Sequence, residues 1–179
     1  RSRALWALGK LPNQGATAVK HALADSNPDI RIVGIRLARE LKQDVASLAP
    51  LAKDSDPAVR RELAISLRHN KSRAASAIWA DLAAQHDGKD RWYLEALGIG
   101  ADQQWDAFLD AYLTRVNGNW NTPAGRDIVW RSRAKQAPTL LAKIITADDT
   151  KEEDQPRYLR ALDFLSGPEK EAALKAILE

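Results

Sequence analysis

Cysteine and methionine are both missing from this chain of 179 residues, and its aromatic side chains are six tryptophans, three tyrosines and two phenylalanines. Without cysteine these residues form no disulfide, offer no thiol nucleophile or zinc–thiolate site, and attach no haem covalently. No apolar run approaches the roughly 18 residues that a membrane-spanning helix requires. These absences exclude several classes of site, and they leave the compartment of the protein open.

Strand patterns are also nearly absent, because β-branched residues do not alternate with polar ones and alanine, leucine, lysine, arginine and glutamate predominate. The pattern instead predicts an all-α chain of about twelve short helices, whose short links make neighbouring helices antiparallel. The predicted helices span 2–10, 15–24, 28–42, 44–53, 57–69, 72–86, 89–98, 102–116, 123–132, 135–147, 155–166 and 168–178.

Positive charge is concentrated in the first part of the chain. Residues 1–73 hold 14 lysines and arginines against 7 acids, a net charge of +7, whereas residues 74–179 hold 13 against 17, a net charge of −4. A nucleic-acid-binding protein usually concentrates its positive charge along one continuous track. The fading excess therefore favours a repeat array with a basic end over a dedicated DNA-binding module.

One short sequence pattern occurs twice, 29 residues apart: ADSNPDIRIVGIRL (24–37) and KDSDPAVRRELA (53–64). Asn27 and Asp56 are placed to cap the following helix, and the proline after each occupies the first helical position, where a missing N–H costs nothing. An apolar stripe follows each proline, and one helix pair is too thin to bury that stripe alone. We therefore expect consecutive helix pairs to stack on one another.

The combination D-x-x-P-x-[IV]-R resembles the HEAT repeat, in particular the short bacterial form found in phycobilisome-lyase-like repeats. The resemblance implies a right-handed α-solenoid of about six helix pairs. This single array covers residues 1–179, with regular repeats over 1–69 and degenerate ones over 70–179. In that family the aspartate and the arginine form a ladder of ion pairs between successive repeats. The resemblance assigns this role to Asp25, Arg31, Asp54 and Arg60, with Arg91 and Arg157 as later rungs that lack the aspartate six residues before them.

No sequence motif indicates catalysis, a cofactor or a metal site. His21, His69 and His86 lack the spacing of metal ligands, and no nucleophile elbow, phosphate-binding loop or dinucleotide fingerprint occurs. Asp106 and Asp110 lie one helical turn apart, which is commoner on a solvated helix face than in an acid–base pair. We expect a non-catalytic segment that binds no cofactor.

The best candidate for a binding surface lies between residues 115 and 135, where five basic residues accompany a single acid and two tryptophans are interleaved. Trp120 falls in the longest polar link, where it either packs back onto the helices or contacts a partner. The arginines either bind a partner or cover a neighbouring helix. The candidate binding residues are Trp120, Arg126, Trp130, Arg131 and Arg133.

The other four tryptophans have a simpler interpretation. Trp79, Trp92 and Trp105 follow one another at intervals of 13 residues, nearly one per predicted helix. Large rings at this spacing wedge adjacent helices together where small residues leave room. We expect this structural role for these three tryptophans and for Trp6.

A second resemblance concerns the context of the chain. The stretches DGKDRWYLEALGIGADQQWDAFLDAYL (87–113) and NTPAGRDIVWRSRA (121–134) are similar to the helical-repeat segment of large exported bacterial proteins. Those proteins combine a β-propeller of the sugar-dehydrogenase type, a HEAT-like array and a c-type haem domain. The chain also begins at Arg1 within a helical pattern. We expect a fragment of such a protein, periplasmic or exported, whose redox chemistry lies outside these residues.

The leading functional hypothesis is a scaffold that contacts a protein partner or sister domains of the same chain. An alternative from another class is a nucleic-acid-binding HEAT-like protein of the DNA glycosylase type. Its candidate residues are Trp120, Asp127, Trp130, Arg131 and Arg133 on a basic concave face. The acidic final third and the lack of a pocket for a base argue against this alternative. A chromophore lyase, suggested by the name of the repeat family, has only an analogy of fold behind it.

Overall fold

The computed structural model describes residues 1–179 and contains helices but no strand, which confirms the all-α class. A helix is present at every predicted place, with ends that differ by a few residues. None of the helices combines the length and the apolarity needed to cross a membrane. The α-helices are α1 Ser2–Gly9, α2 Gly15–Leu23, α3 Pro28–Glu40, α4 Pro57–Ser66, α5 Arg73–Ala83, α6 Arg91–Gly100, α7 Trp105–Arg115, α8 Pro123–Arg131, α9 Ala137–Ile145, α10 Gln155–Ala161 and α11 Pro168–Leu178.

Two segments are wound as 3₁₀-helices, η1 Val45–Lys53 and η2 Leu162–Phe164. The segment η1 differs from the ordinary helix expected there, because Pro50 lies inside it. Proline has no N–H to donate and its ring crowds the preceding turn, so an α-helical hydrogen bond is lost at that point. The segment η2 continues α10, and together they fill the predicted helix 155–166.

The helix starts follow the capping chemistry expected from the sequence. Asn27 and Asp56 each accept a hydrogen bond from the backbone N–H two residues further on, at 2.8 and 2.7 Å. Pro28 and Pro57 are then the first residues of α3 and α4. Thr122 caps α8 by accepting a hydrogen bond from the Gly125 backbone N–H at 3.1 Å, and it too stands immediately before a proline. These local sequences therefore determine where the three helices begin.

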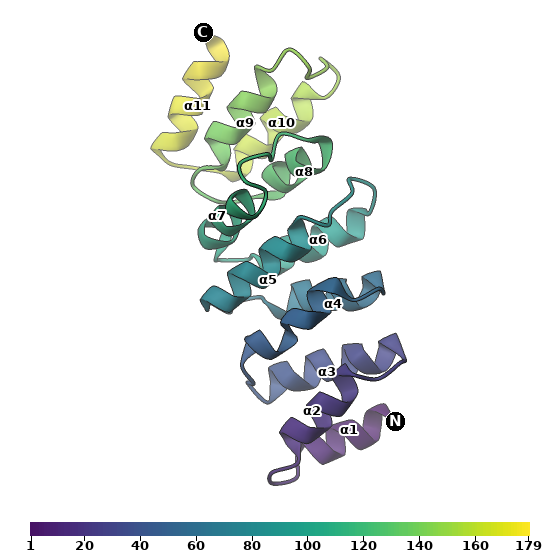
Figure 1. Cartoon of the computed structure of the whole chain (residues 1–179). Coiled ribbons are helices and arrows are strands. Elements are labelled where there is room, and N and C mark those ends of the chain that lie inside the picture. Colours follow the sequence, from purple (N-terminus) through teal and green to yellow (C-terminus); the bar gives the residue numbers. More distant parts are fainter.

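The helices stack along one direction, so that the two termini lie at opposite ends of the molecule (Figure 1). In one layer each helix packs on the next, in the order α1, α3, α4, α6, α8 and α10. In the other layer η1 packs on α5 and α5 on α7, while α9 packs on α11. The second layer is interrupted, because α7 has no packing on α9 comparable to its packing on α5.

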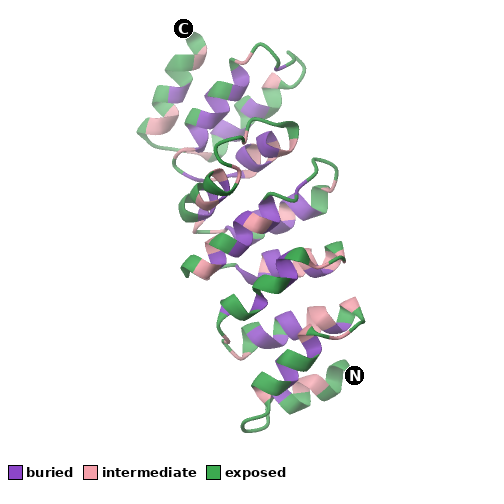
Figure 2. Ribbon diagram, viewed as in Figure 1, coloured by how far each residue is buried: buried purple, intermediate pink, exposed green.

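Apolar side chains between the two layers form a core that runs along the whole stack (Figure 2). Trp79 is completely buried, and its Nε1 donates to the Leu97 carbonyl at 2.9 Å. The rings of Trp105 and Phe108 lie 5.7 and 5.5 Å from that of Trp79. The expected wedging role is therefore confirmed for Trp79 and Trp105. Trp6 is half-buried and packs against the same core.

Candidate interaction surfaces

An ion pair between Arg31 and Asp54 joins α3 to the turn before α4. Nε and Nη2 of Arg31 donate to the two carboxylate oxygens of Asp54 at 2.7 and 2.8 Å, and the side chains are only 14% and 6% exposed. Nη1 of Arg31 donates to the backbone carbonyls of Asp25 and Ser26. One guanidinium group thus holds two successive turns together.

The carboxyl group of Asp54 stays ionised because of its hydrogen bonds. Burial by itself raises the pKa of Asp54, but hydrogen bonds from Arg31 and from the Asp56 amide, together with the charge of Arg31, outweigh it. The pKa of Asp54 therefore lies below its ordinary value. Asp54 is thus an anion in the folded protein at neutral pH.

Asp25 and Arg60 do not form the other ion pairs of the expected ladder. The Asp25 carboxylate lies 3.6 Å from Arg1 instead, because the fourth residue of α1 is Leu5, where α3 has an arginine. Arg60 donates to the backbone carbonyl of Asp54 at 2.5 Å but forms no ion pair, and its buried Nε has no hydrogen-bond partner. Its guanidinium lies 5.9 Å from the centroid of the Tyr93 ring.

A second arginine–aspartate pair, Arg126 with Asp149, lies where the sequence predicted a binding surface, and it resembles the Arg31–Asp54 pair. Arg126 donates to Asp149 at 2.6 Å, to Thr150 at 3.1 Å and to Asn121 at 2.7 Å, and it is only 9% exposed. Arg31 and Arg126 are each the fourth residue of a helix that begins with proline, and each binds an aspartate 23 residues later. That shared spacing is the signal that would have identified Arg126 as structural.

Arg91 and Arg157 do not continue the ladder. Arg91 is the first residue of α6, about 4.5 Å along the helix axis from the fourth position, and it pairs with Glu95 of its own helix at 2.6 Å. Arg157 is the third residue of α10, rotated by about 100° from the fourth position, and it binds Asp127 of α8. Neither arginine stands at the fourth helical position, so neither repeats the Arg31 contact, although the Arg157–Asp127 pair does join α10 to α8.

The arginines of the predicted 115–135 surface do not converge on one site. Arg131 lies against α6, where its Nε donates to Glu95 at 3.0 Å. Arg133 donates to three successive backbone carbonyls at the end of α8, and its guanidinium lies 4.8 Å from the Phe164 ring centroid. Since Arg126 is buried as well, the expected basic patch is dispersed by its own internal contacts.

The two tryptophans of that region are also engaged within the molecule. Trp120 is half-buried and packs against the core, which favours the packing role among the two that the sequence left open. Trp130 is half-buried between Arg91 and Arg157, whose guanidinium carbons lie 5.3 and 4.5 Å from its ring centroid. Neither ring projects freely toward solvent.

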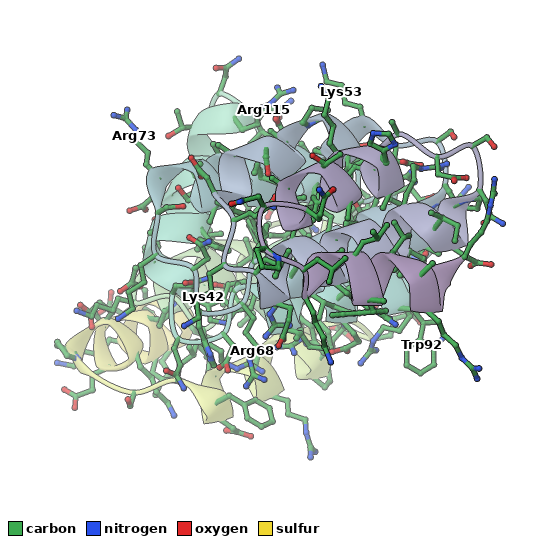
Figure 3. The ribbon with its side chains drawn as sticks, turned by 90° about the horizontal axis from the view of Figure 1, so that it is seen from below. Lys42, Lys53, Arg68, Arg73, Trp92 and Arg115 are labelled. Atoms are coloured by element: carbon green, nitrogen blue, oxygen red, sulfur yellow. The ribbon has the colours of Figure 1, made fainter.

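Trp92 is the tryptophan that does project into solvent, and the wedging role expected for it is wrong. Its side chain is 75% exposed, because Tyr93 and Leu94 take the buried positions in the first turn of α6. Figure 3 shows Trp92 pointing away from the ribbon on the side opposite Lys53 and Arg115.

Isoleucines from successive helices accompany Trp92. A groove of about 510 Å³ is lined by Ile32 of α3, Ile65 of α4, and Ile99 and Trp92 of α6, and Ile99 is 40% exposed. We call these four residues the Trp92 face. The isoleucines follow one another after 33 and 34 residues. The four residues form one surface because α3, α4 and α6 pack side by side.

The arginines around the Trp92 face are all paired with carboxylates. Arg36 pairs with Glu62 at 2.7 Å and Arg61 with Asp90 at 3.2 Å. Glu95 accepts hydrogen bonds from both Arg91 and Arg131. Each of these four arginines has a carboxylate partner, and because Glu95 is shared by two of them the group of four arginines and three carboxylates has a formal net charge of +1. The face therefore presents apolar area with little net charge. Such an area is suited to apolar side chains of a partner.

His86 lies in the interior beside a carboxylate, and its contacts hold neighbouring segments together. Nε2 of His86 lies 3.1 Å from Asp127, and its ring is 2% exposed and stacks on Tyr93 at 6.3 Å. Burial by itself raises the pKa of Asp127, but hydrogen bonds from His86 and Arg157 outweigh it and hold the pKa below its ordinary value. The three polar groups join the loop after α5 to α8 and α10. No group of histidine and acidic side chains has the arrangement of a metal site.

No protein-family model matches this chain, and comparison with curated proteins and with solved structures finds no match either.

Proposed function

We propose that this segment is a non-catalytic, right-handed α-solenoid of the HEAT type, a scaffold that binds a protein partner or a sister domain through the Trp92 face. The observation that carries the proposal is the 75% exposure of Trp92. Tryptophan is enriched among the residues that dominate binding energy at protein interfaces. A contiguous exposed apolar area on a soluble domain is typical of an interaction site.

Several features support the repeat architecture. Two similar turns lie 29 residues apart, and the Arg31–Asp54 and Arg126–Asp149 pairs share one separation of 23 residues. Stacked helix pairs present an extended face in place of a deep pocket, which suits a scaffold. The context that we propose is an exported multidomain redox protein, in which a sister domain would occupy the face.

The chemistry of the face favours one kind of partner. The arginines around the face are already paired, so the face does not favour a strongly charged partner. The isoleucines beside Trp92 favour a partner with an apolar stripe, such as that of an amphipathic helix. The nucleic-acid alternative has less support from its candidate residues, because Arg126 and Arg131 are engaged in ion pairs.

The proposal is tested by photocrosslinking in the cells that produce the protein. With p-benzoylphenylalanine at position 99, we expect one protein or sister domain to be crosslinked, whereas the same group at position 115 on the opposite side gives no such product. The crosslinked protein, once identified and purified, should bind the Trp92→Ser variant at least about tenfold more weakly than the wild type. Equal crosslinking from both positions, or unchanged affinity of the variant, would contradict the proposal.

A further inference from the structure

A run of cations lines one edge of the helix stack, along the turns between the two layers. Three adjoining grooves of about 370, 790 and 400 Å³ lie there. The first and second share Lys71, and the second and third share Arg133 and Lys135. We call the combined feature the basic groove. Its cations are Arg39, Lys42, Arg68, Lys71, Arg73, Arg133 and Lys135.

Most of these cations have no internal partner. Arg39, Lys42, Lys71, Arg73 and Lys135 are exposed and form no ion pair. Arg68 pairs with Asp102, and Arg133 donates only to backbone carbonyls. At the Trp92 face every arginine has a carboxylate partner, whereas most cations of this edge have none, so this edge carries uncompensated positive charge.

The central groove exists because the second layer of helices is interrupted. α7 packs on α5 but not comparably on α9, so the link between α8 and α9 crosses the gap. The Lys135 amide donates to Asp106 of α7 at 2.7 Å, which fixes this link beside the start of α7. Side chains from α5, α7 and the link then surround one hollow, and Trp105 and Phe108 contribute to its lining.

Carboxylates interrupt the basic groove at intervals. Asp102 and Asp106 line the central part and Glu169 the last part, whereas the first part has no acidic residue. Acidic residues inside the track repel a continuous phosphate backbone, which needs a continuous cationic path. The aromatic residues of the central part are 7% and 1% exposed, so they offer no platform on which bases stack.

We infer that the basic groove binds an extended acidic segment of a protein partner, in which glutamates or aspartates alternate with small residues. In an extended peptide, side chains on one face repeat about every 6.6–7 Å. Carboxylates at this spacing can contact the separate cations of the groove, while the small residues between them lie beside the acidic residues of the groove. This site is distinct from the Trp92 face, and the inference stands independently of the function proposed for that face.

The test measures binding by fluorescence anisotropy, with a fluorescein-labelled peptide of alternating glutamate and serine and a single-stranded DNA oligonucleotide of equal charge. We expect the peptide to bind the complete chain and to dissociate as salt rises. The double variant Lys71→Glu with Arg73→Glu should raise the Kd for the peptide at least about tenfold. The matched control is Lys53→Glu with Lys143→Glu, two exposed cations outside the grooves that form no ion pair, and it should leave the Kd nearly unchanged. Figure 3 shows Lys53 on a different edge from Lys42 and Arg73.

Three results would overturn the inference: no peptide binding at low salt, equal weakening in the two double variants, or tighter binding of the oligonucleotide than of the peptide. The third result would assign the groove to nucleic acid. Thermal melts show whether the variants are folded. We expect no decrease in melting temperature, because the replaced side chains are exposed and unpaired. A second double variant, Lys42→Glu with Lys135→Glu, samples the groove at other points and should weaken binding in the same way.

Discussion

At the scale of single residues, the fourth position of a proline-initiated helix has a defined structural task. Arg31 and Arg126 occupy it and reach an aspartate of the following turn, which neutralises a largely covered guanidinium group. Arg60 occupies the same position without such a partner, and its Nε remains unsatisfied. A covered arginine is stabilised only if a carboxylate or carbonyl completes its hydrogen bonds.

Replacement of Asp54 by asparagine tests the value of that pairing. We expect Asp54→Asn to lower the free energy of unfolding by about 2 kcal/mol at neutral pH. This value lies between about 0–1 kcal/mol for an exposed ion pair and about 3–5 kcal/mol for breaking a buried one. The pKa of Asp54 is lowered in the folded state, so its contribution is present above the unfolded pKa of about 3.9 and is lost as the pH falls through the folded pKa. The difference between wild type and variant should therefore shrink below about pH 4. Urea unfolding at a series of pH values measures it.

Asp81→Asn provides the control, because Asp81 pairs with Arg115 at the surface, where the side chains are 41% and 56% exposed. Such a pair contributes about 0–1 kcal/mol. If the two variants lost the same free energy, the Arg31–Asp54 pair would be no more than a surface contact.

At the scale of elements, glycine at the end of α6 allows α6 to approach α4 closely. A Cβ atom on Gly100 would lie 2.2 Å from the carbonyl oxygen of Ala64, and that oxygen belongs to the backbone of a packed helix. A Cβ atom on Gly98 would instead meet the guanidinium of Arg131, the far end of a flexible side chain. The two glycines therefore have different tasks although they lie only two residues apart.

These glycines give a matched pair of substitutions in one helix. We expect Gly100→Ala to lower the unfolding free energy by about 1–3 kcal/mol, because two backbones must separate. Gly98→Ala should be close to neutral, since a gain of about 1 kcal/mol in helix propensity offsets the displacement of Arg131. Thermal or urea unfolding of both variants distinguishes them, and equal effects would show that helix spacing does not depend on Gly100.

At the scale of the whole molecule, packing is local along the chain. Each helix packs mainly on its immediate neighbours or on the next helix but one, from α1 to α11. In such an arrangement stability is close to a sum of unit and interface terms, so a disturbance weakens with distance along the stack. Segments can then open separately, with different free energies.

Native-state hydrogen exchange tests this locality through two reciprocal variants. Leu63 of α4 and Leu141 of α9 are both fully buried, and either change to alanine should cost about 2–5 kcal/mol. We expect Leu63→Ala to reduce amide protection mainly in α3, η1, α4, α5 and α6, and Leu141→Ala mainly in α8 to α11. Equal loss of protection along the chain in both variants would indicate a single cooperative unit instead.

The helices, their order and several of their starts could be predicted from the sequence alone. Asn27, Asp56 and Thr122 cap helices whose first residue is proline, and these interactions involve residues only a few positions apart. Pro50 likewise accounts for the 3₁₀ winding of η1. Such features are readable from sequence because their energies depend on neighbours along the chain.

Which residues are free to bind depends instead on tertiary packing. Arg126 lies in a stretch whose composition predicts a binding surface, yet it is buried and donates hydrogen bonds to Asp149 and Thr150. Trp92 has the spacing of a core residue, yet its side chain lies in solvent. The basic groove likewise joins cations from three separate turns. These outcomes depend on how far apart stacked helices lie and which side chains meet across them, and distances between remote segments are set by packing and not by local sequence.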